Sequence, residues 1–101
     1  GRFNGCGILV GTDSFFSEKK KLMKTITYDH FKNKKYDGCH STITISKIKT
    51  YFLDGKLKSI SKFVASYEGE ANPCGTWKEF NNTGKLLKKI SHPNCSDLYS
   101  F

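Results

Sequence analysis

Apolar and polar residues alternate along this chain in short runs, and turn-forming residues separate the runs. In residues 22–28, for example, Leu22, Ile26 and Tyr28 share one parity, while threonines occupy positions of the other parity. A period of two predicts a β-strand with one apolar face. We therefore expect a mainly β protein, built as an antiparallel sheet of hairpins in a meander.

One phrase of this pattern occurs twice, 29 residues apart. Residues 48–57 read Ile-Lys-Thr-Tyr-Phe-Leu-Asp-Gly-Lys-Leu, and residues 77–86 read Trp-Lys-Glu-Phe-Asn-Asn-Thr-Gly-Lys-Leu. Each copy has a large apolar residue, a lysine, an aromatic residue, turn formers and then Gly-Lys-Leu, which is the order of a hairpin with a tight turn. We predict one turn at Asp54-Gly55, of the two-residue type I′ form, and another near Asn82-Thr83-Gly84.

The strands beside these turns follow from the same alternation. They are expected at residues 56–67, 76–80 and 85–91. Before the first turn, the parity of the apolar residues changes between Ile45 and Ile48. A change of parity within one strand predicts a bulge or bend near Ser46-Lys47.

The first 30 residues are less regular. Ile8, Leu9 and Val10 lie between glycines and favour a short strand. Asp13 stands a few residues ahead of Glu18, a spacing typical of the N-terminus of a helix. We therefore expect one short N-terminal helix here, which continues into the lysines at 19–21.

A chain of 101 residues has the size of one small domain. Within a single domain at 1–101 we distinguish an N-terminal strand and helix region at 1–30, two hairpin units at 31–91 and a tail at 92–101. Fourteen aromatic residues supply material for a core, while Ser, Thr, Asn and Lys are abundant, as in twisted strands with one wet face. No stretch is long and apolar enough to cross a bilayer.

The formal net charge of +8 comes from sixteen lysines and one arginine set against nine acidic residues. Base-edge readout and bidentate phosphate binding depend on arginine, so sequence-specific recognition of nucleic acid is not expected. A basic surface favours an acidic protein partner, or an anionic membrane or glycan surface. Alternatively, the scattered lysines only keep exposed strands soluble and prevent edge-to-edge pairing.

Four widely spaced cysteines, without any Cys-x-x-Cys pair, predict two disulfides. Of the three possible pairings we prefer Cys74 with Cys95 and Cys6 with Cys39, because each closes a loop that is local in the chain. Disulfides indicate an extracytoplasmic location, in the periplasm, on the cell surface or outside the cell. Four buried thiols in a cytosolic protein are the alternative.

Residues 75–86, Gly-Thr-Trp-Lys-Glu-Phe-Asn-Asn-Thr-Gly-Lys-Leu, resemble the variant MORN repeat of bacterial proteins that are often labelled antitoxin-like. That repeat is built around a Gly, a Trp, an aromatic pair, an Asn-Gly-type turn and Lys-Leu. Residues 49–59 look like the same unit, and residues 31–38 look like the connector before it, so the resemblance covers 31–91. It implies a row of antiparallel hairpins in an elongated sheet that binds proteins or lipid surfaces.

The sequence contains no pattern typical of an active site, a metal site or a cofactor site, so we expect none of these and no enzyme activity. Asp37 and Asp54 each precede a turn glycine, which gives them a structural role. Two Cys/His clusters, Cys39-His40 and His92-x-x-Cys95, could in principle supply zinc ligands, but disulfide pairing explains the cysteines better.

We expect a non-catalytic protein-binding module, an inhibitor or immunity protein that neutralises an acidic partner such as an effector toxin. The alternative is a surface-associated module that binds anionic lipid or glycan through its lysines. The predicted binding surface is a patch of aromatic residues rimmed by lysines on the two hairpins. It comprises Trp77, Tyr51, Phe80, Phe52, Lys49, Lys58, Lys78 and Lys85. The same four rings would alternatively form the core of a rolled sheet.

Overall fold

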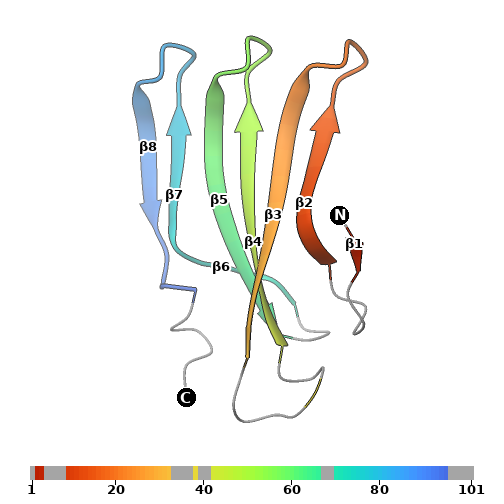
Figure 1. The fold of residues 1–101 in the computed structure, drawn as a ribbon. Coiled ribbons are helices and arrows are strands. Elements are labelled where there is room, and N and C mark those ends of the chain that lie inside the picture. Colours follow the sequence, from red (N-terminus) through yellow and green to blue (C-terminus); the bar gives the residue numbers. More distant parts are fainter. Residues whose placement is uncertain (1, 4–8, 33–37, 39–41, 67–69, 96–101) are drawn as a thin grey trace.

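The protein is described by a computed structural model that covers residues 2–3, 9–32, 38, 42–66 and 70–95. These residues form an antiparallel sheet, and no α-helix occurs among them (Figure 1). The strands are β1 (Arg2–Phe3), β2 (Leu9–Phe16), β3 (Leu22–Lys32), β4 (Thr42–Tyr51), β5 (Leu57–Ser66), β6 (Asn72–Pro73), β7 (Thr76–Phe80) and β8 (Leu86–Ser91). Their order in the sheet is β1-β2-β3-β4-β5-β7-β8, and β6 pairs with β5. The mainly β meander expected from the alternation is thus confirmed.

The short N-terminal helix expected from Asp13 onward is wrong. Asp13 lies in β2, and its carboxylate accepts a hydrogen bond of 3.2 Å from the hydroxyl of Tyr28 on β3. Residues 17–21 form the turn between these strands, closed by a bond of 2.9 Å from Lys20 N to Ser17 O. Pairing with β3 across the sheet therefore outweighs the local capping signal, as tertiary contacts often do.

The two predicted hairpins are present and share one turn geometry. In the β4–β5 hairpin, Gly55 N donates to Phe52 O at 2.9 Å, and the φ of Gly55 is 91°. In the β7–β8 hairpin, Gly84 N donates to Asn81 O at 3.0 Å, with a φ of 90° at Gly84. Asp54 has no positive φ, so the two-residue type I′ form is wrong, and each loop has three residues with the last one left-handed.

A third hairpin, β2–β3, has the same turn. Lys20 occupies the left-handed position with a φ of 61°, and it is the one residue other than glycine with a positive φ in the described part of the chain. The pairs that flank the three turns also correspond, namely Phe16 with Leu22, Tyr51 with Leu57 and Phe80 with Leu86. All three turns project from the same end of the sheet (Figure 1). The sheet is therefore a row of three equivalent hairpins.

The bulge expected near Ser46-Lys47 is also wrong. Both residues are regularly paired with β5, and the register of β4 against β5 shifts between Thr50 and Tyr51, beside the turn. The parity of the apolar residues changes because β4 is apolar on opposite faces at its two ends. Ile45 lies on one face and Ile48 on the other.

Fully buried apolar side chains gather at the end of the sheet that lies away from the three turns. Ile43 and Val64 are buried together with Cys74, and Phe31, Ile45 and Cys95 pack against them. The predicted Cys74–Cys95 disulfide is confirmed, with Cα atoms 4.9 Å apart. Cys6 and Cys39, the other predicted pair, lie outside the described residues.

Candidate binding surface

The cross-strand register assigns side chains to the two faces of the sheet. Residues that lie directly opposite each other share a face, and successive residues of one strand alternate between faces. Lys49 of β4 lies opposite Ile60 of β5, Ile60 lies opposite Lys78 of β7, and Lys78 lies opposite Lys89 of β8. These four side chains form one row across the sheet. Trp77, which precedes Lys78, therefore points to the other face.

We call the first of these faces the lysine face, defined by five lysines around Ile60. These are Lys47, Lys49, Lys62, Lys78 and Lys89. Two pairs among them are directly opposite in register, Lys47 with Lys62 and Lys78 with Lys89. Like charges in that position destabilise an antiparallel sheet. The fold thus carries two unfavourable charge pairs on one face.

No described carboxylate forms an ion pair with the lysines of the lysine face. Asp29 lies on this face, because it is opposite Ile45 in register, and it lines a shallow hollow together with Lys47 and Lys62. Among the residues that the structure describes, no carboxylate oxygen lies within 4.0 Å of the Nζ atoms of these lysines; an ion pair of 3.9 Å occurs instead in a turn, between Lys56 and Asp54. Within the described ranges, the amino groups of the lysine face thus have no acidic partner at ion-pair distance.

The opposite face, which we call the aromatic face, contains Trp77, Phe63 and His92. The Trp77 ring lies 5.1 Å from the ring of Phe63 and 4.6 Å from that of His92, between ring centroids. Its indole Nε1 donates to the carbonyl oxygens of Lys62 at 3.0 Å and Cys74 at 3.2 Å. Trp77 is thereby fixed on both its apolar and its polar side, and it anchors β7 to β5.

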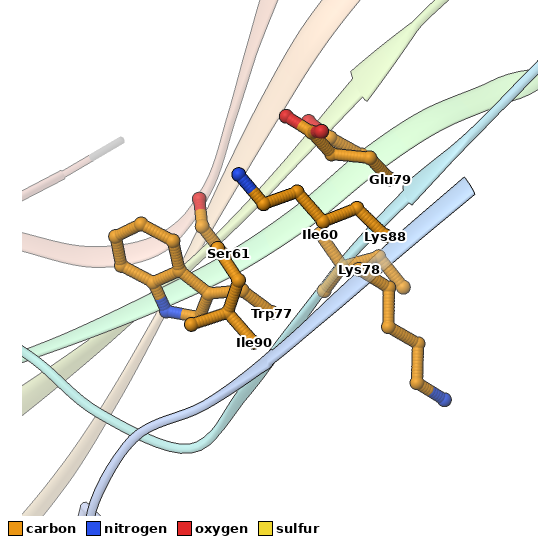
Figure 2. Close-up of a pocket in the computed structure, with 8 residues that line it drawn as sticks. Ile60, Ser61, Trp77, Lys78, Glu79, Lys88 and Ile90 are labelled. Atoms are coloured by element: carbon orange, nitrogen blue, oxygen red, sulfur yellow. The ribbon is translucent and has the colours of Figure 1, made fainter. Parts of the chain in front are cut away.

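Lysines on the aromatic face lie next to aromatic or acidic side chains. The Nζ of Lys24 lies 4.7 Å from the centroid of the Phe15 ring, within the range of a cation–π contact. Lys88 lies opposite Glu79 in register, without an ion pair within 4.0 Å. Figure 2 shows the side chains of Lys88 and Glu79 on one side of the sheet, whereas Lys78 extends away from them.

A small cavity of about 170 Å³ opens on the aromatic face between β5 and β7 (Figure 2). Trp77, Ser61 and Ile90 line it, together with the Lys88 and Glu79 side chains. Beside the turns, a wider and shallower hollow of about 670 Å³ is lined by Phe52, Phe80, Lys58, Asn82, Leu87 and their neighbours. Each hollow is lined by at least one lysine and by Glu79. Neither lining is therefore purely cationic.

The predicted partner-binding residues do not form one patch. Phe52, Phe80 and Lys58 come together at the wider hollow, where the Lys58 Nζ lies 5.8 Å from the Phe52 ring centroid. Trp77 belongs to the aromatic face, and Lys49 and Lys78 belong to the lysine face. The remaining two, Tyr51 and Lys85, lie beside and within the turns that follow β4 and β7.

Sequence reasoning missed three members of the lysine face, Lys47, Lys62 and Lys89. The shared parity of Lys47 and Lys49 was a signal that these two lie on one side of a strand. Placing Lys62 and Lys89 beside them requires the register between strands. That register depends on the irregularities beside the turns, between Thr50 and Tyr51 and between Glu79 and Phe80.

Exposed large apolar side chains concentrate at the end of the sheet that bears the turns. We call this end the turn edge, and its apolar members are Phe15, Phe16, Met23, Leu53, Leu86 and Leu87. Leu53 is 67% exposed and Phe16 is 61% exposed. Exposed lysines lie in the same turns, at Lys19, Lys20, Lys21, Lys56 and Lys85. The turn edge thus combines apolar and cationic groups.

In the described ranges, no three His, Cys, Asp or Glu side chains are grouped so that they could hold a metal ion. No helix of the part of the chain covered by the structure is long and apolar enough to cross a membrane.

One family model, the MORN repeat variant, matches residues 73–92. The match covers the β7–β8 hairpin, which includes Trp77, and the preceding residues Cys74 and Gly75. It supports the resemblance to MORN repeats that the sequence suggested, and the equivalent turns extend the same hairpin form to β4–β5 and β2–β3. No curated protein and no solved structure matches the chain.

Proposed function

We propose that this chain is a non-catalytic binding module that captures an acidic protein on its lysine face, and that it acts as an inhibitor or immunity protein in a bacterial extracytoplasmic compartment. One observation carries the proposal. The lysine face holds two directly opposed lysine pairs, Lys47 with Lys62 and Lys78 with Lys89, and no described carboxylate pairs with them.

Electrostatics explains how such a face would work. Each opposed lysine pair costs the free protein roughly 0.2–1 kcal/mol, and a carboxylate between the two amino groups would turn that repulsion into attraction. A surface charged with one sign also accelerates the encounter with an oppositely charged protein. Relief of this repulsion on binding would therefore contribute to the binding free energy.

The centre of the lysine face favours a protein over a purely ionic ligand. Ile60 is half-buried between Lys49 and Lys78, so an apolar side chain lies inside a charged border. An apolar centre with a polar rim is typical of protein interfaces. The confirmed Cys74–Cys95 disulfide supports an oxidising compartment, such as the periplasm, the cell surface or the medium, where a toxin of a competing cell would be met.

A second candidate function is attachment to an anionic lipid surface through the turn edge. Exposed apolar side chains such as Phe16 and Leu53 lie there beside lysines. Apolar groups that enter the headgroup region and lysines that meet anionic lipid are the two parts of interfacial binding. An anionic glycan would contact the lysines without using the apolar groups.

A pair of charge-reversal variants tests the first candidate. The probe is an acidic protein that co-purifies with the chain from its native host in a defined stoichiometry, and the readout is the association rate at several salt concentrations. We expect Lys49→Glu/Lys78→Glu to slow association about tenfold at low salt and to weaken its salt dependence. Lys19→Glu/Lys24→Glu makes the same change in net charge away from the lysine face, in the β2–β3 turn and on the aromatic face, and should slow association much less.

Equal effects of the two double variants on the association rate would contradict capture by the lysine face, because the net charge of the protein would then explain both. Vesicles of anionic phospholipid separate the second candidate, because Phe16→Ser/Leu53→Ser should abolish co-sedimentation if the turn edge inserts. An unaltered protein that does not sediment with such vesicles would exclude attachment to lipid.

A further inference from the structure

Among the described strands, β8 lies at one edge of the sheet. β8 pairs with β7 on one side, and no described strand pairs with it on the other (Figure 1). An exposed edge strand is a template for another strand unless side chains or covering segments prevent pairing. Within the described residues, the backbone N–H and C=O groups on the outer side of β8 thus have no partner strand.

The pairing of β7 with β8 shows which of these groups point outward. His92 N donates to Gly75 O at 2.9 Å and Gly75 N donates to Pro93 O at 2.7 Å, so Gly75 occupies a hydrogen-bonded position of the ladder. Bonded and non-bonded positions alternate along an antiparallel ladder, and the register runs from Thr76 opposite Ser91 to Lys78 opposite Lys89. Lys78 with Lys89 is then a non-bonded pair. The backbone N–H and C=O of Lys89 are directed away from β7, toward the outer side of β8.

The side chains of β8 select what can pair there. Lys89 points to the lysine face, Lys88 and Ile90 point to the aromatic face, and β8 contains no acidic residue. In a self-complementary antiparallel pair with a second copy of the chain, the cluster formed by Lys88 and Lys89 would face its own counterpart, and like charges across a ladder are destabilising. A strand that carries carboxylates would instead be attracted by both β8 and the adjacent Lys78.

We propose that the acidic partner docks through an extended segment that adds to β8 as the next strand of the sheet. Its residues alternate, with carboxylates beside Lys89 on the lysine face and apolar side chains beside Ile90 on the aromatic face. The main chain supplies affinity and the alternation supplies selectivity, as in other strand additions. This inference rests on the proposed capture of an acidic protein and adds the form in which that protein binds.

The probe is an octapeptide of alternating Glu and Val with blocked ends, and its control has the same length and charge but carries Pro in place of two central Val residues. Two variants distinguish the contribution of the Lys89 charge to peptide affinity from that of its backbone N–H. Lys89→Gln removes the charge and keeps the outward N–H, whereas Lys89→Pro removes the N–H as well and spares the bonds to β7. We expect affinity to fall about threefold in Lys89→Gln and at least thirtyfold in Lys89→Pro, measured by fluorescence anisotropy.

Amide hydrogen exchange of the unaltered protein gives a readout that does not depend on how Lys89→Pro folds. The Lys89 amide should exchange at least tenfold more slowly with the Glu-Val peptide bound, while the inward Ile90 amide changes little. Equal affinities of the two variants, or an unprotected Lys89 amide with the peptide bound, would overturn strand addition while acidic capture stands. Failure of the peptide to bind at millimolar concentration would overturn it too. Capture itself is judged separately by Lys49→Glu/Lys78→Glu.

Discussion

The lysine face and the aromatic face belong to the same strands, but the lysines on them have different neighbours across the sheet. On the aromatic face Lys24 lies over a phenylalanine ring and Lys88 lies opposite a glutamate. On the lysine face Lys47 lies opposite Lys62, and Lys78 lies opposite Lys89. Composition alone therefore does not show how the charge of a basic protein is distributed, because lysines of one strand can face a lysine on one side of the sheet and an aromatic or acidic residue on the other.

The two faces are anchored at the same level of the sheet, but by different contacts. On the aromatic face Trp77 contacts Phe63 and His92, and its indole donates to the carbonyl of Cys74. On the lysine face Val64, the residue after Phe63, is buried beside the disulfide. The aromatic face thus relies on ring contacts, and the lysine face relies on the cross-link and a small aliphatic cluster.

Removal of the disulfide should produce the largest effect. Cys74→Ser/Cys95→Ser opens a cross-link between residues that are 21 positions apart and should lower the free energy of unfolding by about 3 kcal/mol. Urea denaturation measures the loss. If the cross-link anchors the lysine face, amide exchange should accelerate more at Val64 than at Ile90. Uniform acceleration would show that the two faces lose stability together.

A substitution of Trp77 should have the next largest effect. Trp77→Leu removes two ring contacts and the donor to the Lys62 and Cys74 carbonyls, and should cost about 2 kcal/mol. Affinity for an acidic probe on the opposite face should stay within about twofold at a temperature where the variant is folded. A loss of binding much larger than the loss of folded protein would mean that the faces are not separate.

Charge reversals within the sheet should have the smallest effect and opposite signs on the two faces. Lys62→Glu converts the Lys47–Lys62 pair into an attractive one and should raise the free energy of unfolding by a few tenths of a kcal/mol. Lys88→Glu places two carboxylates opposite each other, because its partner is Glu79, and should lower it by a similar amount. Thermal denaturation at low and high salt checks both predictions, since salt should reduce the stability difference between each variant and the unaltered protein. The same sign for both variants would contradict the comparison.

Local patterns predicted the hairpins well where turn chemistry and alternation agreed. The strand at 76–80 and the turn ending at Gly84 follow from the sequence, and so does the Cys74–Cys95 pairing. The first hairpin was missed because Lys20 stands where the other two have glycine, and a lysine gives no sign that it will adopt a left-handed conformation.

The binding surface was harder to predict than the fold because it depends on register. Parity within a strand relates Lys47 to Lys49, but only the pairing of four strands brings Lys62, Lys78 and Lys89 beside them. An irregularity of one residue next to a turn shifts every partner beyond it to the other face. Such irregularities leave no clear mark in the sequence.

A single-layer sheet has a further consequence for how the protein meets a partner. The molecule measures 46 × 29 × 16 Å, and few of its described side chains are fully buried. Small folds of this kind have little stability in reserve, typically about 5 kcal/mol at the low end of the usual range. A ligand at one hundred times its dissociation constant adds about 2.7 kcal/mol to the folded state. If the proposed capture on the lysine face occurs, a bound partner would supply a substantial share of the stability of the folded chain, and proteases in the same compartment would degrade the unbound molecules first.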